Sequence, residues 1–348
     1  MILGLLAIFV LVLVLPFASR RVEENLEAFL FVMGLAAAFA GGALSRRLVL
    51  HAVRDPLAIT AAVLVMGLLF RLARGPVESG VRALQRRVPA RLLVFGVILL
   101  LGVLSSVITA IIASLVLAEI IHVLSLQRRA EIRIVVLACF ATGLGAALTP
   151  IGEPLSTLAV AKLAGPPYHA GFWFLLKHLG PWVLPGILGF ALLSLLFHEP
   201  PAASAADTLD DAPEERARDE SLREVLLRAA KVYLFVMALV LLGEGFKPVV
   251  DLYLVRLPGA ALFWINTVSA ILDNATLTAA ELSPAMDLGQ IRDVLLGLLL
   301  AGGILIPGNI PNIIAAGRLK ISMREWARFG APVGFAAMGL CFLLLLVF

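Results

Sequence analysis

One acidic residue lies in the middle of an apolar stretch, where a charge is costly. Asp273 interrupts the run AALFWINTVSAILDNATLTAA, residues 260–280. An ionised carboxylate at the centre of a bilayer costs at least about 2.5 kcal/mol. Uncharged oxygens near it are the ligands that a hard monovalent cation prefers. The run therefore predicts an ion-binding carboxylate, or alternatively a carboxylate paired with another helix only to hold the packing. The neighbouring polar residues are Asn266, Thr267, Ser269, Asn274 and Thr276.

Two further apolar segments are interrupted by glycine and proline. They read ATGLGAALTPIGEP (141–154) and LAGGILIPGNIPN (300–312). A break in the helix frees backbone groups that lipid cannot satisfy, so it survives only inside protein or beside a water-filled cavity. Discontinuous helices present carbonyl ends to cations and amide ends to anions. Glu153, between Gly152 and Pro154, is a second acidic candidate or an ordinary capping carboxylate, and a simple proline kink is the alternative for either break.

The elements that carry these residues must be membrane helices. Of 348 residues, 61% are apolar, and the mean hydropathy is +1.01. In a soluble domain, the apolar fraction averages nearer half of the residues. The apolar runs here have about the length that crosses a bilayer. Single segments are predicted near residues 2–17, 28–44, 57–71, 172–197, 230–246 and 329–347, and longer, interrupted ones near 92–123, 134–161, 258–282 and 293–317. Residues 323–329 are expected to form a separate amphipathic helix on the membrane surface, with Trp326 as an interfacial anchor.

The interrupted segments resemble each other in pairs. Setting Gly152 on Gly308 places Glu153 on Asn309 and Ser156 on Asn312 without a gap. In the other pair, Thr109 falls on Ser269, and Ala113 falls on Asp273. Chance matching of two glycine-rich apolar segments is the alternative. Self-similarity of this kind predicts an internal repeat.

Placement of Lys and Arg indicates how the copies are oriented, because cytoplasmic loops hold the excess positive charge. If segments 92–123 and 258–282 are re-entrant hairpins, 20 of the 28 basic residues fall on the inner side. This topology puts the 198–228 and 318–328 loops inside and Phe348 outside. The exception to the charge rule is the 46–54 stretch, whose basic residues this topology places outside. The predicted fold is an all-α polytopic membrane protein of two inverted repeats, with about eight spanning segments plus two hairpins. The expected parts are an extra N-terminal helix (1–27), a first repeat (28–198), a cytoplasmic linker (199–228) and a second repeat (229–348).

The chain resembles the ion transporter superfamily, closest to NhaD-type sodium/proton antiporters and a related family of proposed cation transporters. The resemblance lies in SAILDNATLTA (269–279) and ATGLGAALTPIGEP (141–154), and it covers about residues 90–165 and 258–320. It implies a homodimer in which hairpins and broken helices move against a scaffold. Two departures stand out: the first hairpin has Ala113 and Ser114 in place of an acid and an amide, and the Ser-Asn-Thr signature of dicarboxylate carriers is missing.

The predicted function is secondary transport, most simply Na⁺/proton antiport in a bacterial or archaeal inner membrane, with competition at Asp273. A sodium-coupled anion or carboxylate symporter is the alternative, and an intramembrane enzyme is a third reading. No cofactor, nucleic acid or catalytic residue is expected; the partners are the transported cation and proton, the lipid bilayer and a second copy of the chain. The predicted ion-site residues are Asp273, Asn274, Asn266, Thr267 and Ser269 in the second hairpin, Ser105, Ser106 and Thr109 in the first, and Gly152, Glu153, Pro154, Ser156, Gly308, Asn309 and Asn312 at the breaks.

Overall fold

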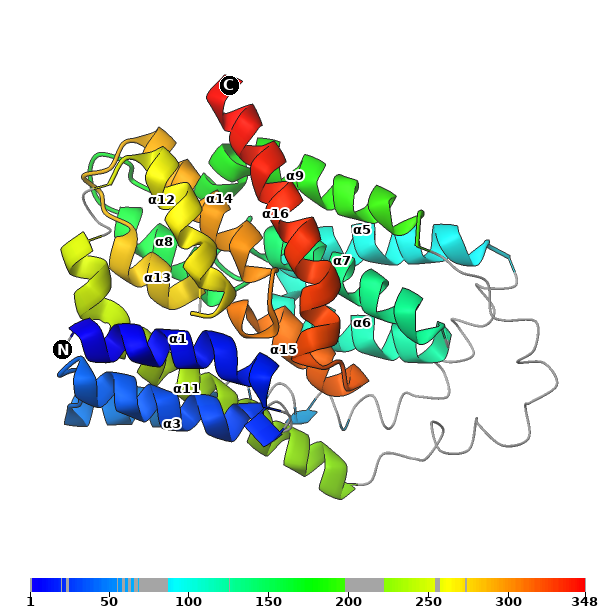
Figure 1. Ribbon diagram of the computed structural model, residues 1–348. Coiled ribbons are helices and arrows are strands. Elements are labelled where there is room, and N and C mark those ends of the chain that lie inside the picture. The colour runs from blue at the N-terminus through cyan, green and yellow to red at the C-terminus, as the bar shows by residue number, and fades with distance from the viewer. Residues whose placement is uncertain are drawn as a thin grey trace.

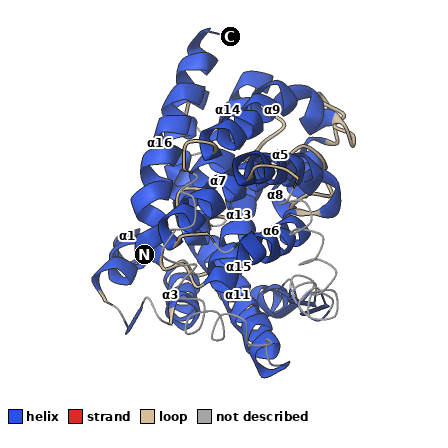
Figure 2. Cartoon of the chain, turned by 90° about the vertical axis from the view of Figure 1, so that its right-hand side faces the viewer, coloured by secondary structure: helices blue, strands red, loops and turns tan. Residues whose placement is uncertain are grey.

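The computed structural model describes residues 2–19, 21–22, 25–54, 56–57, 60–61, 64–65, 68, 87–124, 126–197, 222–253, 257–272 and 274–347. Within these ranges all regular structure is helical and no strand occurs, as Figures 1 and 2 show. The prediction of an all-α protein is confirmed. Asp273, Phe348 and most of the 198–228 loop lie outside the described residues.

The helices of the first half are α1 (Ile2–Ala18), α3 (Leu26–Ala40), α5 (Ala90–Ile108), α6 (Ala110–Leu124), α7 (Arg128–Ala146), α8 (Pro154–Leu163) and α9 (Phe174–Ser194). Those of the second half are α11 (Leu222–Tyr253), α12 (Gly259–Ile265), the 3₁₀ turn η2 (Asn266–Ala270), α13 (Asn274–Glu281), α14 (Leu288–Gly302), the 3₁₀ turn η3 (Ile306–Gly308), α15 (Ile310–Leu319) and α16 (Met323–Val347). Each of the four interrupted segments predicted from the sequence is split into two helices in the structure.

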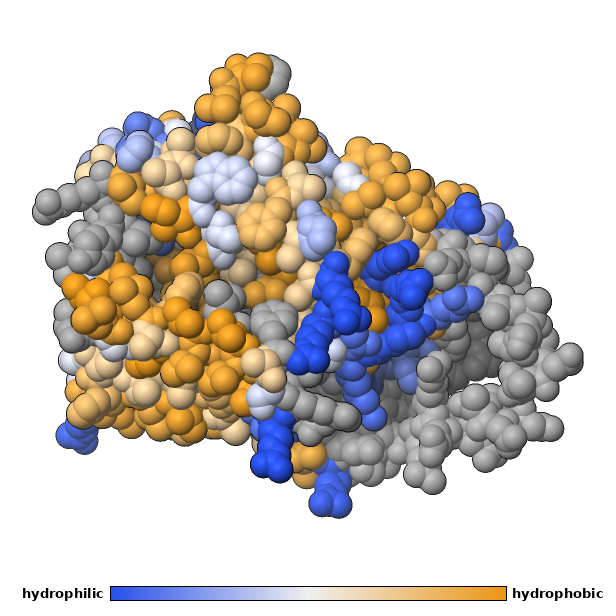
Figure 3. Space-filling model, in the orientation of Figure 1, coloured by the Kyte–Doolittle hydropathy of each residue, from blue (hydrophilic) through white to orange (hydrophobic). Residues whose placement is uncertain are grey.

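Within the described residues, four helices are long and apolar enough to cross a membrane: Ala90–Ile108, Phe174–Ser194, Ala229–Val249 and Met323–Val347. At 1.5 Å per residue, the 21 residues of α9 span about 30 Å, the thickness of the hydrocarbon core. Large apolar side chains point outward, such as Leu343 and Leu346 of α16. Figure 3 shows a broad apolar surface over α1, α3 and α16, while hydrophilic side chains gather near α6, α15 and the start of α16. These features are those of a membrane protein.

Small residues bring α3 and α11 together. A Cβ on Gly41 would lie 2.2 Å from the carbonyl oxygen of Gly245, and one on Gly34 would lie 2.8 Å from that of Ala238. Helices in lipid associate through such close backbone contact, since burial of apolar side chains gives little driving force there. The pair forms one side of the molecule, with α1 alongside (Figure 1).

The order hairpin, broken helix, single helix occurs twice along the chain. The first copy is α5–α6, α7–α8 and α9, and the second is α12/η2–α13, α14–α15 and α16. The packing is reciprocal, because α6 contacts α15 while α13 contacts α8. The broken helices therefore pass each other in the interior, and each hairpin contacts the far half of the other copy's broken helix.

The beginning of α16 corrects one expectation. Residues 323–329 are the first turns of a continuous helix that runs to Val347, not a separate surface helix. Trp326 is fully buried, and its indole N–H donates to the carbonyl oxygen of Gly303 at 3.2 Å. This tryptophan holds the second helix break from inside the protein, whereas the amphipathic pattern suggested a residue at the membrane surface.

Candidate ion site at the helix breaks

The two helix breaks have the same backbone geometry. Glu153 (φ −157°, ψ 163°) and Asn309 (φ −153°, ψ 161°) are extended residues placed directly before α8 and α15. The glycines before them have equivalent surroundings. A Cβ added to Gly152 would lie 2.0 Å from Ala146 O, and a Cβ added to Gly308 would lie 2.4 Å from Gly302 O. Only glycine permits so close a turn of the chain back onto the end of the preceding helix.

A polar side chain in the first turn of each second half-helix ties the two halves together. Ser156 Oγ donates to Glu153 O at 2.7 Å and to Ala146 O at 3.4 Å. In the other copy, Asn312 Nδ2 donates to Gly302 O at 2.9 Å and to Leu305 O at 2.8 Å. The bonds to Ala146 O and Gly302 O satisfy carbonyl groups at the last residues of α7 and α14, where the helices end. The sequence alignment of Ser156 with Asn312 therefore corresponds to a shared structural role.

The tip of the first hairpin is attached to the first break. Thr109 has φ 73°, which ends α5 and turns the chain into α6. The next residue, Ala110, donates its N–H to Gly152 O at 2.9 Å, and Thr149 Oγ1 donates to Ser106 O. This tip and this break form one connected unit.

The tip of the second hairpin lies against the second break. A Cβ on Gly308 would come within 2.7 Å of Ser269 O, and one on Gly302 within 3.7 Å of Asn274 Nδ2. Asn309 caps α15, because its Oδ1 accepts from Asn312 N at 3.1 Å. The predicted residues Ser269, Asn274, Asn309 and Asn312 thus gather around the end of α14.

Helix α7 joins the two units. Ser105 of the first hairpin donates its hydroxyl to Thr142 O at 2.9 Å, and a Cβ on Gly143 would lie 3.0 Å from Asn309 Nδ2. The end of α7 thus contacts the first hairpin through Thr142 and the second break through Gly143. Thr142 was not among the predicted residues, and its position inside ATGLGAALTPIGEP was the available signal.

Several polar atoms in this region have no hydrogen-bond partner within the described part of the chain. They are Thr142 Oγ1, Ser269 Oγ, Asn274 Nδ2 and Asn312 Oδ1. The four residues are each no more than 4% exposed. An unsatisfied buried polar atom costs about 1–3 kcal/mol, and a bound ion or water would satisfy such atoms. Three are oxygens, the ligand type of hard cations, and we name the four residues the central polar group.

The remaining predicted residues contribute in different ways. Asn266 is fully buried, and its Nδ2 donates to Val294 O of α14 at 3.2 Å. Ser106 donates to Val103 O within α5 at 2.8 Å, and Thr267 in η2 donates to Trp264 O at the end of α12 at 2.5 Å. Glu153 is buried, while Pro154 is exposed at the start of α8. Asp273, the central prediction, lies outside the described residues.

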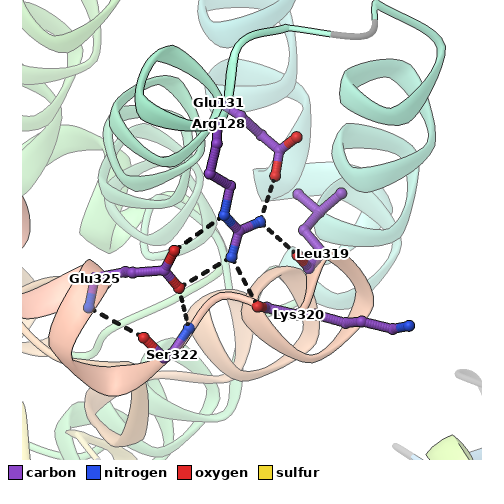
Figure 4. A network of polar contacts seen from close by, with 6 residues as sticks. All are labelled: Arg128, Glu131, Leu319, Lys320, Ser322 and Glu325. Atoms are coloured by element: carbon purple, nitrogen blue, oxygen red, sulfur yellow. Dashed lines mark hydrogen bonds and ion pairs between the residues drawn. The ribbon is translucent and has the colours of Figure 1, made fainter. Parts of the chain in front are cut away.

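A charged network fixes the far end of α15 (Figure 4). The Arg128 guanidinium donates to both carboxylate oxygens of Glu325 at 3.0 and 2.9 Å, to Glu131 at 2.8 Å, and to the carbonyls of Leu319 and Lys320 at 2.9 and 2.8 Å. These contacts join the start of α7 to the α15–α16 turn. An Arg318–Glu119 ion pair ties the same end of α15 to α6. The position of the second break thus depends on both ends of α15.

Comparison with known proteins places the chain in one family. The chain belongs to the family described as "Protein of unknown function (DUF1646)", whose model matches residues 2–348. A search of curated proteins gives no match.

Proposed function

We propose that this DUF1646-family protein is a secondary active transporter that exchanges a monovalent cation, with Na⁺ the first candidate, for protons. The observation that carries the proposal is the central polar group, where buried oxygens that lack a partner among the described residues lie at two interrupted helices. Interrupted helices at membrane depth supply ion sites in secondary transporters. Asp273 follows directly on the described tip of the second hairpin, so we assign it the carboxylate of this site.

We further propose that the two copies are inverted repeats. The repeated element order, the matching conformations of Glu153 and Asn309, and the reciprocal packing of α6 on α15 and α13 on α8 support this. The charge distribution supports opposite orientations of the two copies in the membrane. Repeats arranged in this way allow alternating access, because one repeat unit rocks against the other around a fixed site. From the resemblance, we also propose that the protein works as a homodimer in a bacterial or archaeal inner membrane.

Exchange follows from competition for one carboxylate. A cation and a proton cannot both neutralise Asp273, so binding of one releases the other. The carboxylate without either ligand rarely changes sides, because a bare buried charge is costly in transit. Opposite fluxes are then coupled without a second binding site. The sodium-coupled anion symporter is disfavoured because the central polar group contains only hydroxyl and amide side chains. An enzyme would need a catalytic pair at one depth, for which the sequence offers a single central aspartate.

Reconstitution of the purified protein into liposomes tests the function. With a pH dye inside the vesicles, an outward Na⁺ gradient should drive proton entry in wild-type vesicles and none in Asp273→Asn vesicles. Li⁺, K⁺ and candidate anions in place of Na⁺ identify the ion. If protons move only when an anion gradient is applied with Na⁺ on both sides, the symport proposal replaces the antiport proposal. If no ion gradient drives any flux, the proposal that the protein is a transporter is wrong.

A further inference from the structure

Three helices meet at one end of the membrane spans, around the side chain of Arg133. This residue lies in the second turn of α7, and its Cζ atom is 5.1 Å from the ring centre of Phe197 and 5.9 Å from that of Phe329. The two rings pack edge to face, with their centres 5.1 Å apart. Phe197 follows the end of α9, and Phe329 lies in the second turn of α16. Both helices are candidate membrane spans, so the guanidinium lies at one end of the two spans.

The two rings hold the Arg133 side chain without using its hydrogen bonds. An aromatic ring attracts a guanidinium through its π face, whereas the N–H groups bind an oxyanion such as phosphate in pairs. Within the described part of the chain, no oxygen accepts a hydrogen bond from Arg133. The side chain is partly buried. Arg133 is therefore fixed in position, and its donors suit an oxyanion ligand.

Two further arginines extend the positive charge along α16. Arg324 and Arg328 are four residues apart and both exposed, so they share a face of the helix, and Arg328 directly precedes the phenylalanine of α16. Arg324 lies in the first turn, where the positive end of the helix dipole disfavours a cation and favours an anion. The acids at the start of α7 and α16, Glu131 and Glu325, are both bound by Arg128. Figure 3 shows the hydrophilic side chains at the start of α16 next to the apolar surface of the same helix. An anion from outside the chain would therefore be attracted to this end of α16.

The surroundings favour the phosphate of a membrane lipid over a free anion. Phe197 and Phe329 are partly exposed at the end of two spans, and they offer apolar contact that inorganic phosphate cannot use. The charge-based topology places this end of α9 and α16 inside, where the leaflet contains anionic lipids. Basic pockets between membrane helices on that side bind lipid head groups.

We propose that this region binds the phosphate group of an anionic phospholipid. We name it the inner lipid site, and it consists of Arg133, Arg324, Arg328, Phe197 and Phe329. Arg133 donates to the phosphate oxygens, the two arginines of α16 add attraction, and the rings pack against the apolar part of the lipid. The bound lipid joins α7, α9 and α16 beside the charged network of Figure 4, which fixes one end of α15. This inference does not depend on the proposed transport function, because neither the transported ion nor the central polar group takes part in it.

Native mass spectrometry of the purified full-length protein in detergent tests the site, because it counts bound lipids directly. Dioleoyl phosphatidylglycerol is the anionic probe, and dioleoyl phosphatidylcholine is the neutral probe with the same chains. The wild type should bind one phosphatidylglycerol about tenfold more tightly than phosphatidylcholine. Arg133→Gln should remove most of this preference, and the double variant Arg324→Gln, Arg328→Gln should weaken phosphatidylglycerol binding about fivefold or more. Arg91→Gln is the matched control, an exposed arginine at the start of α5 on the same side in the charge-based topology, and it should leave binding unchanged.

Several results would contradict the inference. Equal affinity of the wild type for the two lipids, or an equal loss in Arg91→Gln, would mean that the protein has no specific site for the anionic lipid. If inorganic phosphate displaces phosphatidylglycerol at a similar concentration, the site takes a free anion and not a lipid. Should Arg133→Gln not fold, the double variant decides, because both of its positions are exposed.

The acidic run in residues 207–220 provides a separate test, since its carboxylates could reach the same arginines. In a variant with these Asp and Glu residues changed to Asn and Gln, phosphatidylglycerol should bind as it does to the wild type. Binding that occurs only in this variant would mean that the chain's own carboxylates occupy the arginines, and the lipid proposal would be wrong.

Discussion

Asn312 Nδ2 donates to the carbonyl oxygen of Gly302 across the second helix break, at 2.9 Å. Gly302 is the last residue of α14, and Asn312 lies in the first turn of α15. One side chain therefore satisfies the end of one half-helix from inside the other. No described group donates to Asn312 Oδ1, so the same residue holds the break together and leaves an oxygen open to a ligand.

Replacing Asn312 by leucine should destabilise the protein strongly. The change leaves Gly302 O buried without the Asn312 donor, at about 1–3 kcal/mol, and leaves Leu305 O with only the long bond from Gly308 N at 3.4 Å. Ser156→Ala is the matched control in the other break, where the bond across the gap is long at 3.4 Å. Thermal unfolding in detergent, followed by tryptophan fluorescence, should show a clearly larger loss of Tm for Asn312→Leu. Equal losses would mean that the two side chains do not differ in their role.

Gly308→Ala should abolish transport and lower stability, because its Cβ would lie 2.4 Å from Gly302 O and 2.7 Å from Ser269 O. Gly317→Ala is the control on the same stretch of chain, since a Cβ there meets nothing within 4 Å. In a helix, that change should stabilise the protein by about 0.5–1 kcal/mol. Flux and Tm are measured for both variants. Normal transport by Gly308→Ala, or by the Gly308→Ala, Pro311→Leu pair, would indicate that the break is only a kink.

Antiport at Asp273 predicts a specific pH dependence. Protons and cations compete for one carboxylate, so acidification should raise the apparent KM for the cation, approaching tenfold per pH unit once the carboxylate is mostly protonated. The maximal rate should change much less. Initial rates in proteoliposomes over a range of pH and Na⁺ concentration measure both. A KM that does not change with pH would leave Asp273 a structural role only.

The Arg128 network should contribute to stability through its geometry rather than its charge alone. Its ion pair with Glu325 is partly exposed, at 39% and 31% of the side chains, so the pair itself contributes about 0–1 kcal/mol. The bonds to the carbonyls of Leu319 and Lys320 need the planar fork of arginine. Arg128→Lys should therefore lower Tm nearly as much as Arg128→Ala. Arg129→Ala, at the exposed neighbour, is the control and should have little effect on Tm. If Arg128→Lys were as stable as the wild type, the charge of Arg128 alone would account for its contribution to stability.

The topology is open to labelling in intact cells. The exposed positions Ala285 and Arg129 lie on opposite sides of the membrane in the charge-based topology. In a protein whose Cys139 and Cys341 are replaced by alanine, Ala285→Cys should react with an impermeant thiol reagent, and Arg129→Cys should react only after the cells are opened. The reverse pattern would invert the whole assignment.

Local chemistry in the sequence was sufficient for the positions of the helix interruptions. Glycine and proline act on the backbone within a few residues, so the breaks around Gly152 and Gly308 were predicted where they occur. The correspondence of Ser156 with Asn312 was also visible, because both follow equivalent breaks at the same spacing. The membrane class followed from composition, since lipid selects apolar runs of bilayer length.

Only the tertiary structure decided which of these polar groups meet and which are buried. Trp326 and Glu281 are both fully buried, although their sequence neighbourhoods suggested a surface anchor for the first and drew no attention to the second. Thr142 contacts Ser105 from 37 residues away, and such contacts depend on how helices distant in the sequence pack. Burial and hydrogen-bond partners are properties of that packing. By itself, the sequence determined where the chain is interrupted; the fold determined which side chains face the interruption, because a helix does not encode which neighbour will cover each of its faces.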